Sequence, residues 1–332
     1  MKFCVYGAGA IGGYLAVELA LSGQEVCVVA RGAHLDAIQA HGLKLLIHGH
    51  EKIARVAASS NPSALGPQDF VICALKAHQA FACAADFAPL LGPHTAVVTA
   101  MNGIPWWYFY KSGGRFAGHW LDSVDPGGRQ WNAIGPERAI GCVVEPACEV
   151  IAPGVIAHHE FNRFILGEPG GDSSSRVLAL RGALMAAGFD APIRDNIRWN
   201  IWLKLWGNVC FNPISMLTGA TLGRLIGDPE LNALCKTMML ETRAVNEALG
   251  IHIPAEMMER RLAGAAVAAD HKMSMLQDLE RGRSLEIDAL VGVVREMGLL
   301  SGIATPMING VLSLAKERGR SAGLYTPLTA LR

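Results

Sequence analysis

The fold of the first half is decided by Gly7-Ala8-Gly9-Ala10-Ile11-Gly12, close to the start of the chain. This stretch follows a β-rich run over 2–6 and opens a helical run over 10–22. In such a strand–turn–helix, the first glycine makes the turn, the second admits a pyrophosphate and the third lets helix pack on strand. The free N–H groups of the helix N-terminus then bind phosphate. The pattern predicts a dinucleotide site, against the alternative of a glycine-rich turn without a ligand.

Outward from this loop, short β-rich runs alternate with helical runs. Further strands are predicted at 25–30, 69–75 and 95–100, with a helix near 78–91. Residues 42–59 read as an added hairpin, and strand-like runs continue over 139–168, at AIGCVV, GVIAH and RFILGEP. Strands that alternate with helices imply a parallel sheet with crossover helices.

The character of the chain changes near Ile193. The loop GEPGGDSSS precedes a helix to about Gly188, which Ser173–Ser175 can cap. From Asn196 to the end, helical periodicity dominates. We therefore expect an α/β domain over 1–193 and an all-helical domain over 194–332.

Composition excludes several classes of function. Hydrophobic residues make up 51% of the 332 and charged residues 17%, so the chain is globular. Lys plus Arg equals Asp plus Glu at 29 each, so no basic excess favours nucleic acid or an anionic membrane.

No apolar run is long enough to span a bilayer and no signal peptide is recognisable, so we expect a cytoplasmic protein. The eight cysteines lack CxxC or metal spacing, and we expect reduced structural thiols and no metal site.

The end of the second strand indicates which dinucleotide is bound. A site for NAD usually has an acidic residue there, which holds the ribose 2′-hydroxyl. This strand ends in Arg31, whose guanidinium suits the 2′-phosphate of NADP. Lys76, at the carboxyl end of DFVICAL, can add a second cation. The alternative is that Arg31 is a solvated loop charge.

A polar stripe is predicted on the long helix that begins after Asn196. It comprises Asn200, Lys204, Asn208 and Asn212, which recur every four residues. Trp199, Trp202 and Trp206 fall on a nearly opposite face. The stripe either presents an amine and amides to a cleft or is a solvated face, and periodicity alone leaves both open.

Several blocks of the sequence resemble the ketopantoate reductase family. They are GAGAIGG, the strand-end Arg31, LKAHQ, MNG at 101–103, IRWNIWLKLWGNVCFNP and SMLQDLERGRSLEID. They occur in the family's order and span most of the chain. The resemblance implies an N-terminal Rossmann domain, a helical domain and an active site in the cleft between them.

The resemblance also implies roles for individual residues. Lys204 matches the family's proton-donating lysine, and Glu286 is expected to join it as a catalytic residue. Substrate contacts are expected from Asn102, Asn208, Asn212 and Ser274. The cofactor NADP is expected to contact the loop residues Gly7, Ala8, Gly9, Ala10, Ile11 and Gly12, and also Arg31, Lys76, Asn102 and Ala147.

The implied activity is NADPH-dependent reduction of a small branched 2-oxo acid, ketopantoate to pantoate, in pantothenate biosynthesis. One alternative is a paralogue that reduces another branched or aromatic 2-oxo acid. Another is a catalytically silent NADP-binding sensor, against which the intact Lys204, Asn208, Ser274 and Glu286 argue. Two departures bear on the substrate: Leu222 stands where some members have an asparagine, and the aromatic run 106–110 is either core or a pocket roof. The sequence does not determine the oligomeric state, and a homodimer is one possibility.

Overall fold

Two compact units make up the computed structural model, which describes residues 1–331. The first unit holds residues 1–120 and 129–197, and the second holds residues 121–128 and the chain from Arg198 onward. The change between them falls after Ile197, a little beyond the expected position at Ile193. The first unit contains the strands and the second is helical, which confirms the predicted order of an α/β half and a helical half.

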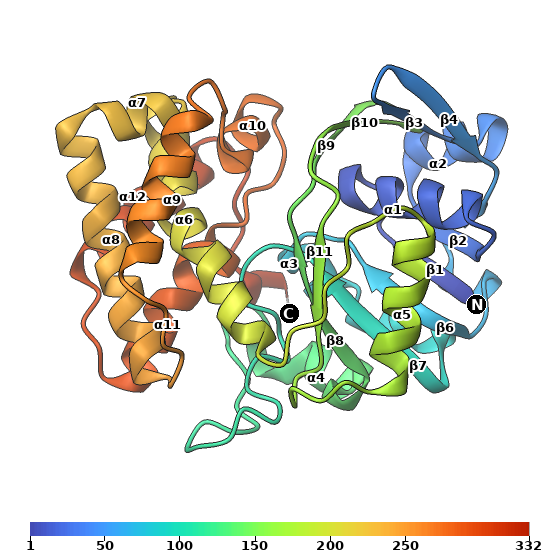
Figure 1. Ribbon diagram of the computed structural model, residues 1–332, viewed down its shortest axis with the longest axis horizontal. Helices are drawn as coiled ribbons and strands as arrows, with labels where there is room; N and C mark the ends of the chain where they lie inside the picture. The colour runs from blue at the N-terminus through green and yellow to red at the C-terminus, as the bar shows by residue number, and fades with distance from the viewer. Residues whose placement is uncertain (332) are drawn as a thin grey trace. The chain divides into compact units, whose positions relative to one another are not determined.

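A seven-stranded sheet forms the centre of the first unit, in the order β11-β8-β7-β6-β1-β2-β5 (Figure 1). Its strands are β1 (Lys2–Tyr6), β2 (Glu25–Val29), β5 (Ala57–Ser59), β6 (Gln68–Cys73), β7 (Leu91–Ala100), β8 (Ala139–Val144) and β11 (Phe164–Gly167). All neighbours pair in parallel except β11, which is antiparallel to β8. The chain therefore starts at the centre with β1, adds strands outward on one side and then on the other, as in doubly wound dinucleotide-binding sheets.

The helices of this unit are α1 (Ala10–Leu21), α2 (Gly32–His41), α3 (Ala77–Ala82), α4 (Arg129–Ile134) and α5 (Ser175–Ala186). The helix predicted near 78–91 is shorter than expected. It ends at Ala82 and continues as a 3₁₀ turn over Ala84–Leu90. Pro89 lies inside that turn and has no N–H to donate to an α-helical ladder.

A second sheet has the order β4-β3-β10-β9, with β3 (Leu43–Ile47), β4 (His50–Ala54), β9 (Ala147–Ala152) and β10 (Val155–Glu160). β3 and β4 are the predicted hairpin, but residues 57–59 leave it and pair with β2 of the main sheet. β9 is not among the predicted strands. It pairs antiparallel with β10.

The helix α1 lies between the two sheets and contacts strands of both. Every residue from Gly12 to Leu19 is buried, which explains why this helix is apolar around its whole circumference. Its Glu18 is the exception, and it forms an ion pair of 2.7 Å with Lys52 on β4. A Cβ at Gly13 would lie 2.6 Å from Cγ1 of Ile156 on β10, so glycine here permits close contact with the second sheet.

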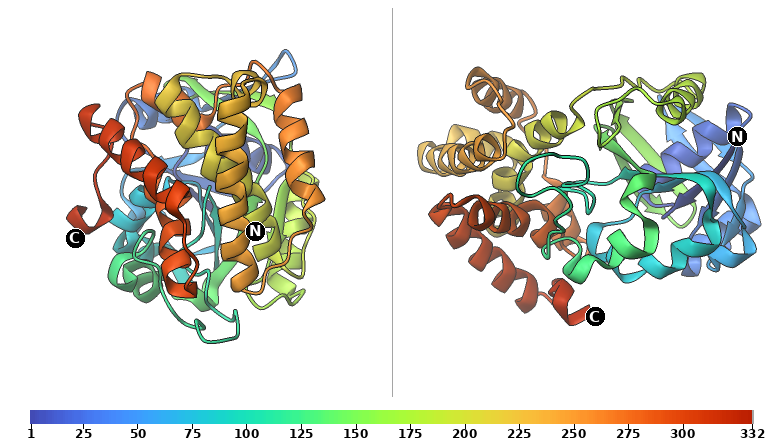
Figure 2. Two further views of the ribbon diagram at one scale, coloured as in Figure 1. Left: turned by 90° about the vertical axis from the view of Figure 1, so that its left-hand side faces the viewer. Right: turned by 90° about the horizontal axis from the view of Figure 1, so that it is seen from below.

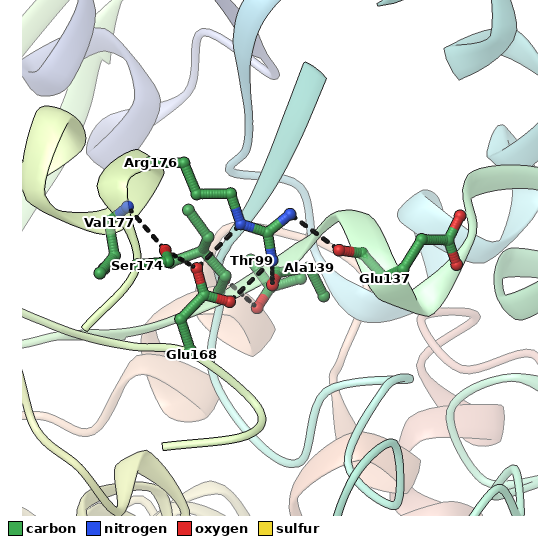
Figure 3. A network of polar contacts seen from close by, with 8 residues as sticks. Thr99, Glu137, Ala139, Glu168, Ser174, Arg176 and Val177 are labelled. Atoms are coloured by element: carbon green, nitrogen blue, oxygen red, sulfur yellow. Dashed lines mark hydrogen bonds and ion pairs between the residues drawn. The ribbon is translucent and has the colours of Figure 1, made fainter. Parts of the chain in front are cut away.

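A polar network fixes the start of α5 (Figure 3). Glu168, 4% exposed after β11, accepts hydrogen bonds from Nε and Nη2 of Arg176 at 2.8 and 2.7 Å and a further one from Ser174. Arg176 also donates to the carbonyls of Glu137 and Ala139. The Ser174 hydroxyl accepts from Val177 N–H, so the predicted serine cap is confirmed. A buried carboxylate is tolerated because its oxygens are paired and hydrogen-bonded.

The second unit is built from α6 (Ile197–Thr218), α7 (Leu222–Gly227), α8 (Pro229–Ala248), α9 (Glu256–Val267), α10 (Ser274–Glu280), α11 (Val293–Ser301) and α12 (Pro306–Ser321). A π-helical turn, Asp288–Gly292, precedes α11. Glu241 of α8 accepts hydrogen bonds from the N–H groups of Met307 and Ile308 and so caps α12. Within residues 1–331, no helix combines the length and apolarity needed to cross a bilayer.

Residues 121–128, here called the strap, belong to the helical unit although they lie in the expected range of the first domain. Glu296 of α11 connects the strap to the helical unit. Its two carboxylate oxygens accept hydrogen bonds of 2.7 Å from the N–H groups of Asp122 and Ser123. Hydrogen bonds to a charged group are among the stronger ones, so α11 holds the strap.

Candidate functional site

The carboxyl ends of three adjacent strands gather the predicted cofactor residues of the first unit. β1 lies between β2 and β6 and is parallel to both. The glycine loop follows β1, Arg31 follows β2 and Lys76 follows β6. Ligands of open α/β sheets bind at this edge. The fold therefore brings the loop and both cations to the same edge of one sheet.

The three loop glycines meet different surroundings, and these fit a bound pyrophosphate. Gly7 has φ +96°, a conformation that favours glycine, and its N–H donates to Val29 O. A Cβ on Gly12 would lie 2.0 Å from Gly7 O, so the helix can approach the loop only without a side chain there. A Cβ on Gly9 would have nothing within 4 Å, and Gly9 is the N-cap of α1 without a side-chain cap. An open backbone at an uncapped helix N-terminus is suited to an anion.

His34, on the first turn of α2, forms hydrogen bonds that hold this loop in place. Its Nε2 lies 2.7 Å from Ala8 O, and its Nδ1 accepts a hydrogen bond of 3.0 Å from Gly154 N–H, in the turn between β9 and β10. Since Nδ1 accepts, Nε2 carries the hydrogen and donates to Ala8. His34 thus ties the loop to α2 and to the second sheet. The sequence analysis did not predict a role for His34. The one feature of the sequence that could have indicated this role is the position of His34, three residues after Arg31.

The remaining predicted cofactor residues follow strand ends or helix starts. Arg31 is exposed and is the N-cap of α2, and Lys76 is half-buried at the N-cap of α3. Asn102 follows β7, also half-buried. Ala147 follows β8 and is the first residue of β9. β7 and β8 extend the same parallel sheet, so their carboxyl ends point to the edge that carries the loop.

The helix α6 presents the predicted polar stripe. Trp202 and Trp206 are fully buried, and Trp206 Nε1 donates to Asn246 Oδ1 at 2.8 Å. Lys204 and Asn208 are half-buried on the other side. Since these two are only partly exposed, the stripe is not a fully solvated face. The helix therefore offers an amine and an amide one turn apart.

Asn212, the last member of the stripe, is 1% exposed and is joined to Ser274. Its Oδ1 accepts hydrogen bonds of 3.0 Å from the Ser274 hydroxyl and from Met275 N–H, at the first turn of α10. The structure thus brings together two predicted substrate residues that are far apart in the sequence. Asn212 holds the start of α10 and the hydroxyl of Ser274 in place.

Glu286 is half-buried and directly precedes the short helical segment that starts at Ile287. Its carbonyl accepts a hydrogen bond from Leu290 N–H.

Leu222, which stands where some members of the family have an asparagine, is 7% exposed at the start of α7, and its N–H donates to His271 O. Glu286 and the α6 stripe belong to the helical unit, whereas Asn102 and the cofactor residues belong to the first unit.

The aromatic run 106–110 is largely core. Trp106, Trp107, Tyr108 and Phe109 are at most 3% exposed. Trp107 donates from Nε1 to Thr99 Oγ1 at 2.9 Å, and its ring packs against Gly141. Burial of this kind supports the interpretation of the run as packing.

The fold defines a dinucleotide-dependent oxidoreductase with a Rossmann-type unit and a helical unit. Residues 3–111 match the family model of ketopantoate reductase PanE/ApbA, and residues 196–319 match the model of its C-terminal domain. The chain belongs to the ketopantoate reductase family, as the sequence resemblance predicted.

Individual relatives agree with this assignment. The chain is 53% identical to the 2-dehydropantoate 2-reductase of Mesorhizobium japonicum over 98% of its own length and 100% of that protein. A crystal structure of a candidate ketopantoate reductase from Ralstonia solanacearum MolK2 is 44% identical, with TM-score 0.93, over 98% and 99% of the two chains. A D-mandelate dehydrogenase solved with NADH and anilino(oxo)acetate has TM-score 0.81 over 98% and 100% of the chains, at 22% identity. This last likeness shows the fold alone.

Proposed function

We propose that this protein is a 2-dehydropantoate 2-reductase, which reduces ketopantoate to pantoate in pantothenate biosynthesis. The observation that carries the proposal is the 53% identity to an enzyme of that name over 98% of the chain. The half-buried Lys204 and Asn208 on α6 support the chemistry, because a carbonyl reduction needs a positioned proton donor.

The proposed cofactor is NADPH. Arg31 stands where an NAD-binding sheet usually has an acidic residue, and Lys76 lies at the same edge of the sheet. A guanidinium and an ammonium suit a 2′-phosphate, whereas the ribose hydroxyl of NADH needs an acceptor. All eight cysteines are free, which supports a reducing, cytoplasmic setting.

In the proposed mechanism, the glycine loop, Arg31 and Lys76 would hold the cofactor, which when bound would supply a hydride to the ketone carbon. The Lys204 ammonium donates a hydrogen bond to the ketone oxygen and transfers its proton as the C=O bond becomes C–OH. The amide groups of Asn102 and Asn208 and the carboxylate of Glu286 orient the substrate. The Ser274 hydroxyl, which Asn212 holds, binds the carboxylate region of the substrate.

A panel of 2-oxo acids tests this proposal by NADPH oxidation. Ketopantoate should give the highest kcat/KM, ahead of other branched acids and of phenylglyoxylate. A higher kcat/KM for another branched acid or for an aromatic acid would replace it with a paralogous reductase. If NADPH binds in a fluorescence titration but no acid is reduced, the chain is a silent sensor.

A further inference from the structure

The C-terminal end of α12 turns back onto the chain around Glu286. Gly323, with φ +70°, donates its N–H to Arg320 O, and Leu324 N–H donates to Gly319 O, both at 2.9 Å. This is a Schellman motif, which ends a helix and reverses the chain. The reversal follows the red C-terminal helix in Figure 2. Residues 316–325 are here called the C-terminal clamp.

The first anchor of the clamp lies just before Glu286. Leu285 N–H donates to Leu324 O at 2.9 Å. Leu285 and Ile287, on either side of Glu286, are 3% and 0% exposed. A Cβ at Gly319 would lie 3.1 Å from Ile287 Cδ1 and 2.6 Å from Tyr325 Cβ, so glycine allows α12 to contact both. Glu286 is therefore flanked by two apolar side chains packed in the core.

The second anchor lies just after Glu286, at Asp288. Its Oδ2 accepts a hydrogen bond of 2.8 Å from the Tyr325 hydroxyl, and its Oδ1 lies 2.8 Å from Lys316 Nζ. The ammonium of Lys316 and the guanidinium of Arg320 also lie over the Tyr325 ring, each 5.6 Å from its centroid. Burial and the Asp288 carboxylate raise the pKa of Tyr325, so the phenol keeps its proton and remains a donor.

Asp288 also begins the π-helical turn Asp288–Gly292. A Cβ at Gly292 would lie 2.7 Å from Asp288 Oδ1, so the carboxylate lies directly over Gly292 and would have to shift if a side chain stood there. Single π turns of this kind are rare and are often found at functional sites. The turn holds the Asp288 carboxylate in the direction of Tyr325 and Lys316.

We propose that Asp288 and Tyr325 are positioning residues for Glu286. The C-terminal clamp fixes the chain on both sides of Glu286 and thereby sets where its carboxylate meets the 2-oxo acid. The proposal rests on the proposed function, in which Glu286 contacts the substrate. A group displaced by about 1 Å can lower a rate by roughly 10²-fold, so an anchor of this kind affects activity without touching the substrate.

Tyr325→Phe removes only the hydroxyl and keeps the ring that lies against Lys316 and Arg320. We expect a fall of about 10- to 100-fold in kcat/KM for ketopantoate, with KM for NADPH unchanged. Asp288→Asn, which weakens the bonds to Tyr325 and Lys316, should act in the same way. Glu259→Gln is the matched control, because Glu259 is exposed on α9, outside the clamp and 3.8 Å from Lys236, and the change should leave both constants unchanged.

A double-mutant cycle with Glu286→Gln separates positioning from general stability. If Tyr325 acts through Glu286, Tyr325→Phe should have little further effect in the Glu286→Gln background. Equal effects in both backgrounds, or a loss explained by a lower melting temperature alone, would overturn the proposal. If Glu286→Gln lowers kcat/KM but Tyr325→Phe does not, the clamp has no such role. If Glu286→Gln has no effect, the assigned role of Glu286 fails and the proposal with it.

Discussion

In the proposed function, the choice of cofactor depends on Arg31. It is exposed, at the N-cap of α2 and at the end of β2, so its guanidinium can reach a phosphate. Charge-assisted hydrogen bonds contribute about 1.5–3 kcal/mol each. An aspartate at the same place would repel a phosphate and accept from a ribose hydroxyl instead.

Arg31→Asp should therefore weaken NADPH binding by about 10- to 100-fold, while NADH binding stays the same or improves. Fluorescence titration of both cofactors measures this. Arg55→Asp, at an exposed arginine between β4 and β5, is the control and should leave both affinities unchanged. Equal losses for NADPH and NADH in the Arg31 variant would remove the argument for a 2′-phosphate site.

Lys204 is the second residue with a sharp prediction. A positioned general acid contributes typically ~10²–10⁴-fold, so Lys204→Ala should lower kcat by about that factor. NADPH affinity should change little, because the phosphates and ribose are assigned to the other unit. In the unaltered enzyme kcat should fall at high pH, as the general acid loses its proton, and this fall should be absent in Lys204→Ala. Lys236→Ala on α8 is the control. A folded Lys204→Ala protein with near-normal kcat would refute this role.

At the scale of the element, two glycines in the turn from β1 into α1 have different roles: Gly12 allows close packing, and Gly9 leaves space for a ligand. Gly12 is needed for the close approach of α1 to the loop, because a Cβ added there would lie 2.0 Å from the backbone oxygen of Gly7. Gly9 has φ −70°, which any residue adopts, and a Cβ added there would meet nothing within 4 Å. The space beside Gly9 is where we place the pyrophosphate.

Gly12→Ala should lower the free energy of unfolding by about 1–3 kcal/mol or more, because the tight contact must open. Gly9→Ala should keep that free energy or raise it by about 0.4–1 kcal/mol, since alanine restricts the unfolded chain. The same variant should weaken NADPH binding by at least about tenfold, or 1.4 kcal/mol. Urea denaturation and cofactor titration on both variants provide the comparison. If Gly9→Ala bound NADPH normally, the loop would not hold the pyrophosphate.

The sequence predicts elements best where local pattern and tertiary environment agree. The loop and strands of the main sheet follow from buried apolar runs between turns. β9 was missed because its residues are half-buried or exposed, so ACEVIA lacks the apolar run of a central strand. The last residues of the expected hairpin join β2 instead, a pairing set by the sheet and not by the hairpin. The contact between Asn212 and Ser274 joins distant segments, and helical periodicity carries no information about it.

At the scale of the whole molecule, the chain passes between the two units more than once. It leaves the first unit after Trp120, returns at Arg129 and leaves again after Ile197. No composition signal marks the strap, which explains why the sequence placed it in the first domain. The hydrogen bonds from its backbone to Glu296 join the strap to α11 of the helical unit.

Glu296→Ala should lower the free energy of unfolding by about 1–3 kcal/mol, because two N–H groups lose a charged acceptor. It should also speed proteolysis in the segment 111–128. Glu317→Ala, at an exposed position of α12, should change stability by less than about 0.5 kcal/mol. Thermal melts and limited proteolysis of the two variants make the test. Equal protease resistance would show that Glu296 does not hold the strap.

The strap has a consequence for the design of chimeric proteins from members of this family. The helical unit is discontinuous in the sequence, so no single crossover point exchanges it whole. A chimera that takes 198–332 from a relative would set a foreign α11 against the native residues 121–128. Only a donor that supplies both segments, or one whose residue at 296 still accepts from the native backbone, preserves the contact. Crossovers at 120, 128 and 197 should therefore give soluble hybrids more often than one crossover at 197.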